Sequence, residues 1–194
     1  MLRAINRDRY EVIPVGITRD GAFVLEADDP DRFALDPERL PQVVDNGTRV
    51  RWPESAASRA LTVTDGAGER SLGDVDVVFP ILHGRFGEDG TVQGLLELAS
   101  VPYVGSGVLG SAVGMDKAAM KAVFAAHGLA QTPYAVVPHV EWTRRPADTT
   151  ARLQALGLPV FVKPANLGSS VGISKVKTWD ALAAAMDTAF AFDR

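Results

Sequence analysis

The stretch VDVVFPILHGRFGEDGTVQGLLELA, residues 75–99, joins an apolar run, a glycine-rich turn and an amphipathic pattern. Residues 75–82 are almost continuously apolar, as expected of a strand that is buried on both faces of a parallel sheet. In residues 91–99 the apolar side chains recur at helical spacing, which predicts a helix with one buried stripe. Strand, turn and helix in this order form the repeating unit of α/β proteins.

Before this stretch, the apolar residues follow a helical or strand pattern less clearly. Residues 2–10 are predicted to be helical and residues 11–17 to form a strand. In residues 20–28 the Asp-Gly pair predicts a turn that is followed by a second short strand. Residues 29–60 are rich in Asp, Pro, Arg and Ser and show no convincing period, so we interpret them as irregular.

After this stretch, strands and helices continue to alternate. The glycines at 105–110 mark a domain boundary, and Asp116 and Gly128 are suitable caps for the ends of a helix. Further strands are predicted at 101–107, 133–137, 159–164 and 173–176, and further helices at 148–156 and from Thr178 to Phe190. We therefore predict an α/β fold in which a mostly parallel-sheet N-terminal domain, residues 1–107, precedes a smaller α+β domain, residues 108–194.

Composition restricts the class of protein. The 194 residues carry a formal net charge of −4 and no cysteine, which argues against a nucleic-acid surface and excludes disulfides and thiolate metal sites. Membrane attachment is not expected, because no apolar run is long enough to span a bilayer and the start does not resemble a signal peptide. These features are compatible with a cytoplasmic protein.

The segment HGRFGEDGTVQG, residues 83–94, is the first candidate site. His83 and Gly84 follow a predicted buried strand, and ligands of open α/β sheets bind at such strand ends. The glycines allow backbone amides to approach an anion. An alternative is a purely structural turn in which Asp89 or Thr91 caps the helix and His83 bonds to the backbone. Glu88 and Asp89 are adjacent in a turn, so we assign them a structural role rather than metal binding.

Two lysines and a loop form the second candidate site. Lys117 falls in the first turn of its helix, where the helix dipole disfavours a cation unless an anion lies nearby. Lys163 ends an apolar strand and precedes a proline. The following Gly168-Ser169-Ser170-Val171-Gly172 is rich in amides and hydroxyls, which suits phosphate binding. The alternatives are a solvated lysine beside Asp116 and a hairpin turn. Together the three features favour a nucleotide site.

These segments resemble a known family. HGRFGEDGTVQGLLELASVPYVGSG, then MDK, then PVFVKPANLGSSVGISKV, look like the conserved sequence of D-alanine–D-alanine ligases, which belong to the ATP-grasp superfamily. The resemblance covers residues 75–194 strongly and 1–30 more loosely, and the insertion at about 29–70 resembles that of the longer actinobacterial ligases. It implies that the first domain is a pre-ATP-grasp domain and the second is the first part of an ATP-grasp domain.

The resemblance also implies a reaction and a set of contacts. In the family, ATP phosphorylates one D-alanine and the amine of a second D-alanine attacks the acyl phosphate, which supplies a peptidoglycan precursor. His83 and Gly84 would contact the first D-alanine, and His83 and Ser169 would be catalytic. The nucleotide would be bound by the two lysines, by a phenylalanine on the adenine-pocket strand and by the loop, that is by Lys117, Phe161, Lys163, Gly168, Ser169, Ser170 and Val171.

Some family features have no counterpart in these residues. The glycine-rich first strand and the acidic segment that binds Mg²⁺ or Mn²⁺ are not found, so we expect no metal ligand here and no ligation by these residues alone. The family implies a homodimer. Two alternatives are a D-alanine–D-lactate ligase, which shares the motifs, and a non-catalytic, truncated nucleotide-binding module.

Overall fold

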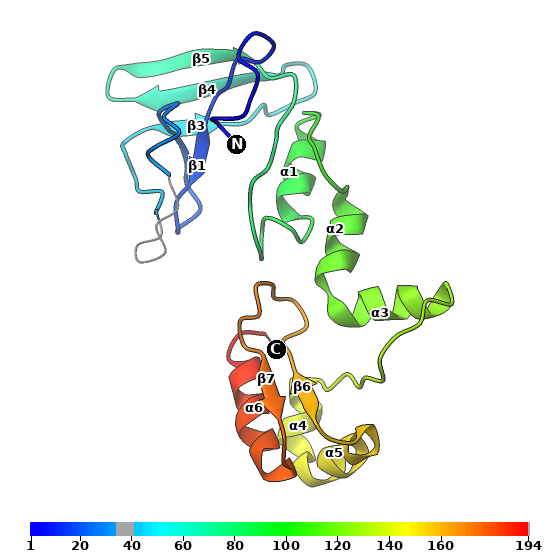
Figure 1. The fold of residues 1–194 in the computed structure, drawn as a ribbon. Coiled ribbons are helices and arrows are strands. Elements are labelled where there is room, and N and C mark those ends of the chain that lie inside the picture. The colour runs from blue at the N-terminus through cyan, green and yellow to red at the C-terminus, as the bar shows by residue number, and fades with distance from the viewer. Residues whose placement is uncertain (34–40, 194) are drawn as a thin grey trace. The chain divides into compact units, whose positions relative to one another are not determined.

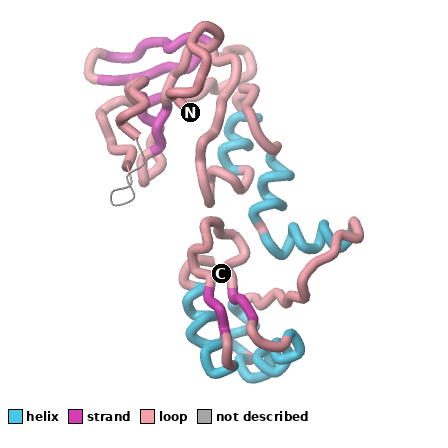
Figure 2. Tube along the Cα trace, in the orientation of Figure 1, coloured by secondary structure: helices cyan, strands magenta, loops and turns pink. Residues whose placement is uncertain are grey.

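The computed structural model describes residues 1–33 and 41–193, so part of the predicted insertion, residues 34–40, lies outside the described residues. The chain contains helices and small sheets, as predicted for an α/β protein (Figures 1 and 2). Its contacts divide it into two compact units. The first contains residues 1–78 and 96–102, and the second contains residues 79–95 and 103–194. The boundary between 107 and 108 stays a prediction.

The first unit contains two small antiparallel sheets. Strands β1 (Val15–Ile17) and β2 (Phe23–Leu25) form a hairpin, which confirms the predicted turn and its second strand. Strands β3 (Arg49–Arg51), β4 (Ala60–Asp65) and β5 (Gly68–Asp74) form a three-stranded sheet in chain order.

The core of this unit lies between the two sheets. Val50, Leu61 and Val63 are buried, and Phe23 packs edge-on against Trp52 with ring centroids 5.7 Å apart. Leu61 and Val63 alternate with threonines along β4, the period of a half-buried strand. The interpretation of residues 29–60 as irregular was therefore wrong at β3 and at the start of β4. The missed signal was this alternation.

The prediction of a strand at 75–82 is wrong. Only Val78 takes part in a bridge, with its N–H donating to the carbonyl of Pro102 at 2.8 Å. The side chains of Val77, Phe79 and Ile81 are about half exposed. At the start of the run the N–H of Val75 also donates to the carbonyl of Arg59, at 3.0 Å. A strand, however, needs a neighbour that accepts and donates along its whole length, and these two isolated bonds do not provide one. For the same reason, residues 101–107 do not form the predicted strand, and among them only Tyr103 takes part in a bridge.

The prediction that the sheet of the N-terminal domain is mostly parallel is also wrong. All strand pairs among the described residues are antiparallel. They join segments that are close in the chain, which short turns can connect, whereas parallel pairs need long crossovers.

Residues 2–10 form turns instead of the predicted helix. The side-chain oxygen of Asn6 accepts the N–H of Asp8 at 2.9 Å. Such a local bond competes with the helical pattern of backbone bonds.

Helix α1 (Thr91–Leu98) has the predicted apolar stripe, with Leu96 and Ala99 buried. Helix α2 (Val108–Met115) begins in the glycine-containing segment where the boundary was predicted. Helix α3 (Lys117–Ala126) begins, as predicted, at an Asp116 cap.

The carboxylate of Asp116 accepts the N–H groups of Ala118 and Ala119, both at 2.8 Å. These bonds, led by that of Ala119, hold the pKa of Asp116 below its usual value. Asp116→Ala should lower the free energy of unfolding by about 1 kcal/mol, the typical value of such a cap, and Asp116→Asn should cost little.

Urea denaturation as a function of pH measures this effect. The pKa is lowered in the folded state, so the difference between wild type and Asp116→Ala should disappear as pH falls through the folded pKa. A difference that is independent of pH would contradict the capping role.

The rest of the second unit is a hairpin packed on helices. Helices α4 (His139–Arg144) and α5 (Pro146–Leu153) and the short η1 (Gln154–Leu156) precede it. The strands β6 (Val160–Val162) and β7 (Ser174–Val176) pair in antiparallel fashion, which confirms the strands predicted at 159–164 and 173–176. The chain continues through η2 (Trp179–Ala181) into α6 (Leu182–Phe190), which ends where predicted.

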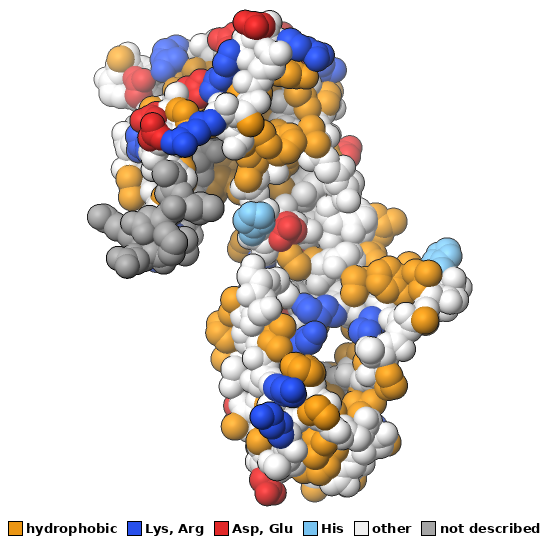
Figure 3. Space-filling model, in the orientation of Figure 1, with side chains coloured by type: hydrophobic (Ala, Val, Ile, Leu, Met, Phe, Trp, Pro, Cys, Tyr) orange, Lys and Arg blue, Asp and Glu red, His pale blue; other side chains and the backbone are white. Residues whose placement is uncertain are grey.

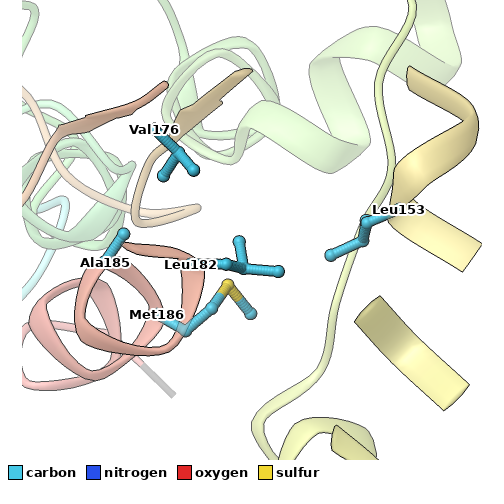
Figure 4. Close-up of a cluster of buried hydrophobic side chains, with 5 residues drawn as sticks. All are labelled: Leu153, Val176, Leu182, Ala185 and Met186. Atoms are coloured by element: carbon cyan, nitrogen blue, oxygen red, sulfur yellow. The ribbon is translucent and has the colours of Figure 1, made fainter. Parts of the chain in front are cut away.

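Five buried side chains from α5, β7 and α6 form the core of this hairpin and its helices: Leu153, Val176, Leu182, Ala185 and Met186 (Figure 4). The predicted strand at 133–137 is absent, although Ala135 and Val137 pack against this core. These apolar side chains are therefore partly buried by the core itself, and the segment needs no strand partner to bury them.

Candidate functional site

The loop that carries His83 is held by its own carboxylates. Glu88 Oε2 accepts the N–H of Gly84 at 2.6 Å, and the two oxygens of Asp89 accept the N–H groups of Phe86 and Thr91 at 2.8 and 3.1 Å. Burial would raise the pKa of Asp89, but these backbone bonds hold it below its usual value. Glu88 and Asp89 therefore have the structural role that was predicted.

Close packing explains two of the glycines in this loop. A Cβ on Gly87 would lie 2.5 Å from Cβ of Leu82, and one on Gly90, whose φ is +92°, would lie 2.8 Å from the carbonyl oxygen of Val108. Gln93 is buried and its Nε2 donates to the carbonyl of Gly87 at 3.0 Å. The loop thus has a defined conformation that presents an exposed His83.

The amide of Gly84 is already bonded to Glu88. Contact of Gly84 with a substrate stays a prediction, and in this conformation another atom of that residue would have to provide it.

Lys117 is bonded to the segment that follows Lys163. Its Nζ donates to the carbonyls of Leu167 and Ala165 at 2.6 and 3.3 Å, and its backbone N–H donates to Ala165 at 3.1 Å. An ammonium group has three donors, so one N–H beyond these two bonds can serve a ligand. The two predicted lysines are therefore brought near each other by contacts between the start of α3 and the segment that follows β6.

The surroundings of Lys117 lower its pKa below 10.5, chiefly through burial and secondarily through the positive charge of Lys163. Asp193 and Asp116 oppose this shift. A lowered pKa means that Lys117 loses its charge at lower pH than an ordinary lysine.

If Lys117 binds phosphate, affinity for ATP should fall at alkaline pH, starting below the range in which an ordinary lysine titrates. The reason is that the neutral amine no longer attracts the anion. The dissociation constant of ATP, measured on the 194-residue chain as a function of pH, reports this effect. In Lys117→Arg the guanidinium keeps its charge, so this alkaline decline should move to higher pH. An unchanged decline in Lys117→Arg would show that another group causes it.

Phe161 lies on β6 with its ring largely exposed, at 56%. Lys163 Nζ lies 5.9 Å and Lys175 Nζ 5.6 Å from the ring centroid. Figure 3 shows Lys and Arg side chains gathered on the visible face of this part of the chain. Exposed cations beside an aromatic ring suit a ligand that has both a flat apolar group and negative charge.

The loop after Lys163 has an unusual backbone. Ser169 and Ser170 have φ values of 53° and 60°, in the left-handed region, and both are exposed. The N–H of Val171 donates to the carbonyl of Gly168 at 3.2 Å. Non-glycine residues adopt this conformation at a cost, and such strain clusters at ligand-binding segments.

Gly172 closes the loop. Its φ is +69°, and a Cβ there would lie 2.8 Å from both Pro164 Cγ and Phe192 Cδ2. The two ends of the loop, at Pro164 and Gly172, therefore meet against the segment that follows α6.

A cavity of about 580 Å³ in the second unit lies beside both candidate segments. Residues of the His83 loop and residues that follow Lys163 line it together with the end of α6. The lining residues are Arg85, Asp89, Met115, Asn166, Leu167, Phe190, Ala191, Phe192 and Asp193. Asn166 and Asp193 were missed by sequence reasoning, because no local pattern marks them.

The described residues do not provide a metal centre. No group of three or more His, Cys, Asp or Glu side chains in residues 1–33 and 41–193 could hold a metal ion. No helix in this part of the chain is long and apolar enough to cross a membrane.

The second unit thus combines two lysines, an exposed aromatic ring and a strained, amide-rich loop that joins β6 to β7, an arrangement suited to binding a nucleotide. Comparison with known proteins identifies the family of the chain. The family model described as "D-ala D-ala ligase N-terminus" matches residues 1–106, and "D-ala D-ala ligase C-terminus" matches residues 123–194. The chain belongs to the D-alanine–D-alanine ligase family, which confirms the resemblance seen in the sequence.

Curated relatives and solved structures agree with this assignment. The chain is 49% identical over 190 residues to a D-alanine–D-alanine ligase of Paenarthrobacter aurescens, covering 97% of this chain and 50% of the relative. It is 50% identical over 187 residues to one of Streptomyces avermitilis, covering 91% and 48%. The chain spans about half the length of the curated relatives it matches.

Among solved structures, the VanG D-Ala:D-Ser ligase of Enterococcus faecalis has a TM-score of 0.77 at 31% identity, covering 98% of this chain and 53% of that one. The D-alanine–D-alanine ligase of Coxiella burnetii has a TM-score of 0.76 at 30% identity, covering 99% and 54%.

Proposed function

We propose that this chain provides the donor-substrate and nucleotide contacts of an ATP-dependent ligase that joins two D-alanines for peptidoglycan precursor synthesis. The observation that supports it best is the convergence of Lys117, Lys163 and the strained loop 168–172 in one unit, in a chain of the D-alanine–D-alanine ligase family. We assign ATP as the co-substrate and D-alanine as donor and acceptor.

The proposed reaction has two steps. A carboxylate oxygen of the first D-alanine attacks the γ-phosphorus of ATP, the bond from that phosphorus to the bridging oxygen breaks, and ADP leaves. The amine of the second D-alanine then attacks the carbonyl carbon of the D-alanyl phosphate. Phosphate leaves with its bridging oxygen, and the attacking nitrogen loses a proton. Both steps develop charge on phosphoryl oxygens, so positioning and charge stabilisation dominate catalysis.

The residues of this chain would act as follows. Lys117 and Lys163 would neutralise phosphate oxygens, and the amides and hydroxyls of Gly168, Ser169, Ser170 and Val171 would face the transferred group. Phe161 would cover the adenine. His83 would hold the carboxylate of the first D-alanine, with Gly84 beside it, and Ser169 would connect the phosphate site to the substrate.

A divalent cation, Mg²⁺ or Mn²⁺, is part of the proposal as the partner of the ATP phosphates. The described residues do not fit as its site, because they form no group of three suitable ligands. No step above is therefore assigned to it. We also propose a cytoplasmic homodimer, for which light scattering coupled to size-exclusion chromatography would measure the mass.

A chimeric enzyme tests the function. This chain replaces the matching residues of the Paenarthrobacter aurescens ligase, and ADP and dipeptide formation from ATP and D-alanine are measured, with the relative itself as the control. We expect ADP and D-alanyl-D-alanine in equal amounts. Parallel assays with D-lactate and D-serine as acceptors identify a different specificity. A folded chimera that binds ATP without turnover would instead support a non-catalytic nucleotide-binding module.

A further inference from the structure

The loop 168–172 is attached to two distant parts of the chain through one residue, Asn166. The backbone N–H of Asn166 donates to Asp193 Oδ2 at 2.7 Å, and its side-chain Nδ2 donates to Asp116 Oδ2 at 3.3 Å. Asp116 caps α3 and Asp193 lies just beyond α6. Asn166 thus joins the start of the loop to both helices.

The residues beside Asn166 are held by the same two elements. Lys117 Nζ donates to the carbonyls of Ala165 and Leu167, on either side of Asn166. At the far end of the loop, Gly172 lies against Phe192, which directly precedes Asp193. Figure 1 shows the segment after α6 running beside the loop between β6 and β7.

These contacts matter because the loop conformation is strained. Ser169 and Ser170 have positive φ values, and this conformation persists only if the surroundings enforce it. Within the loop, the bond of Val171 to Gly168 spans only three residues. Contacts at Asn166 and Gly172 hold both ends and leave the serines exposed to a ligand.

We propose that Asn166 and Asp193 are positioning residues that hold the 168–172 loop in the conformation that receives phosphate. Neither touches the reacting atoms in this assignment. Asp193 fixes the backbone of Asn166, and the side chain of Asn166 fixes the loop to the cap of α3. The part of this inference that concerns phosphate rests on the proposed function, whereas the part that concerns loop conformation does not.

Hydrogen exchange on the 194-residue chain tests the conformational part. In Asp193→Ala, the amides of residues 166–172 should exchange about tenfold faster, as expected for loss of a hydrogen bond to a charged group. Amides of α6 and β7 should be unaffected. Asp193→Asn keeps an oxygen that can accept from Asn166, so it should restore most of the protection. Asn166→Ala tests the second attachment and should also accelerate exchange in the loop.

Asp187→Ala is the matched control, because Asp187 is an exposed carboxylate on α6 of the same unit. It should leave exchange in the loop unchanged. The inference is overturned if Asp193→Ala has no local effect, or if it accelerates exchange equally in α6 and β7, which would mean general destabilisation.

The chimeric ligase tests the phosphate part. Asp193→Ala should lower kcat/KM for ATP about tenfold, and Asp193→Asn should remain near wild type. An unchanged kcat/KM for ATP in Asp193→Ala would overturn the role in phosphate binding. An inactive wild-type chimera would count against the proposed function, and hydrogen exchange would still decide whether Asn166 and Asp193 hold the loop.

Discussion

Leu182→Ala should lower the free energy of unfolding of the second unit by about 2–5 kcal/mol, the range for truncating a buried leucine. Leu182 is only 2% exposed and lies at the centre of the cluster in Figure 4, where side chains from α5, β7 and α6 meet. The alanine would lose apolar contacts and leave a cavity that three separate elements cannot easily close. Such a loss is a large fraction of a typical domain stability.

Urea denaturation followed by tryptophan fluorescence measures this effect, since Trp142 and Trp179 both pack against the cluster. The matched control is Leu109→Ala, because Leu109 is 77% exposed in the same unit. That substitution should change the free energy of unfolding by less than about 0.5 kcal/mol. Equal effects of the two substitutions would contradict the assignment of Leu182 to the core.

Lys163→Ala should lower kcat/KM for ATP of the chimeric ligase about 10- to 100-fold, the equivalent of one lost bond to a charged group. Lys163 is exposed at the end of β6, beside the ring of Phe161 and before the strained loop. Its removal leaves the phosphates with one fewer cation. The pKa of Lys117 is lowered chiefly by burial and secondarily by the charge of Lys163, so the same change also removes this second cause.

Steady-state kinetics with ATP as the varied substrate measure this loss. Lys177→Ala removes the same charge from an exposed position just after β7, so it controls for the overall change in charge. We expect it to alter kcat/KM less than about twofold, because isolated exposed charges contribute little. If both substitutions had the same effect, Lys163 would have no specific role at the phosphates.

Elements whose signals are local could be predicted from the sequence. The apolar stripe of α1, the Asp116 cap of α3 and the glycine-containing loop between β6 and β7 each depend on residues within a few positions of one another. Caps and turns depend on such short-range bonds. The lysines and the serine loop were recognisable for the same reason, since residue type and order indicate their chemistry.

Strands could not be predicted as reliably. The apolar run at 75–82 has the composition of a buried strand, but its backbone bonds depend on partners that the run itself does not specify. The β3–β4–β5 sheet, in contrast, forms in a polar region, because Leu61 and Val63 alternate and find Val50 across the sheet.

The family, helices such as α1 and α3, and the residue types of the candidate site are therefore predictable from the sequence. How these parts are held together depends on the tertiary structure. Asn166 meets Asp193 and Asp116 across 27 and 50 residues of chain, and Lys117 meets Leu167 across 50. Such bonds form because packing brings distant segments together, so no periodicity or spacing along the chain records them.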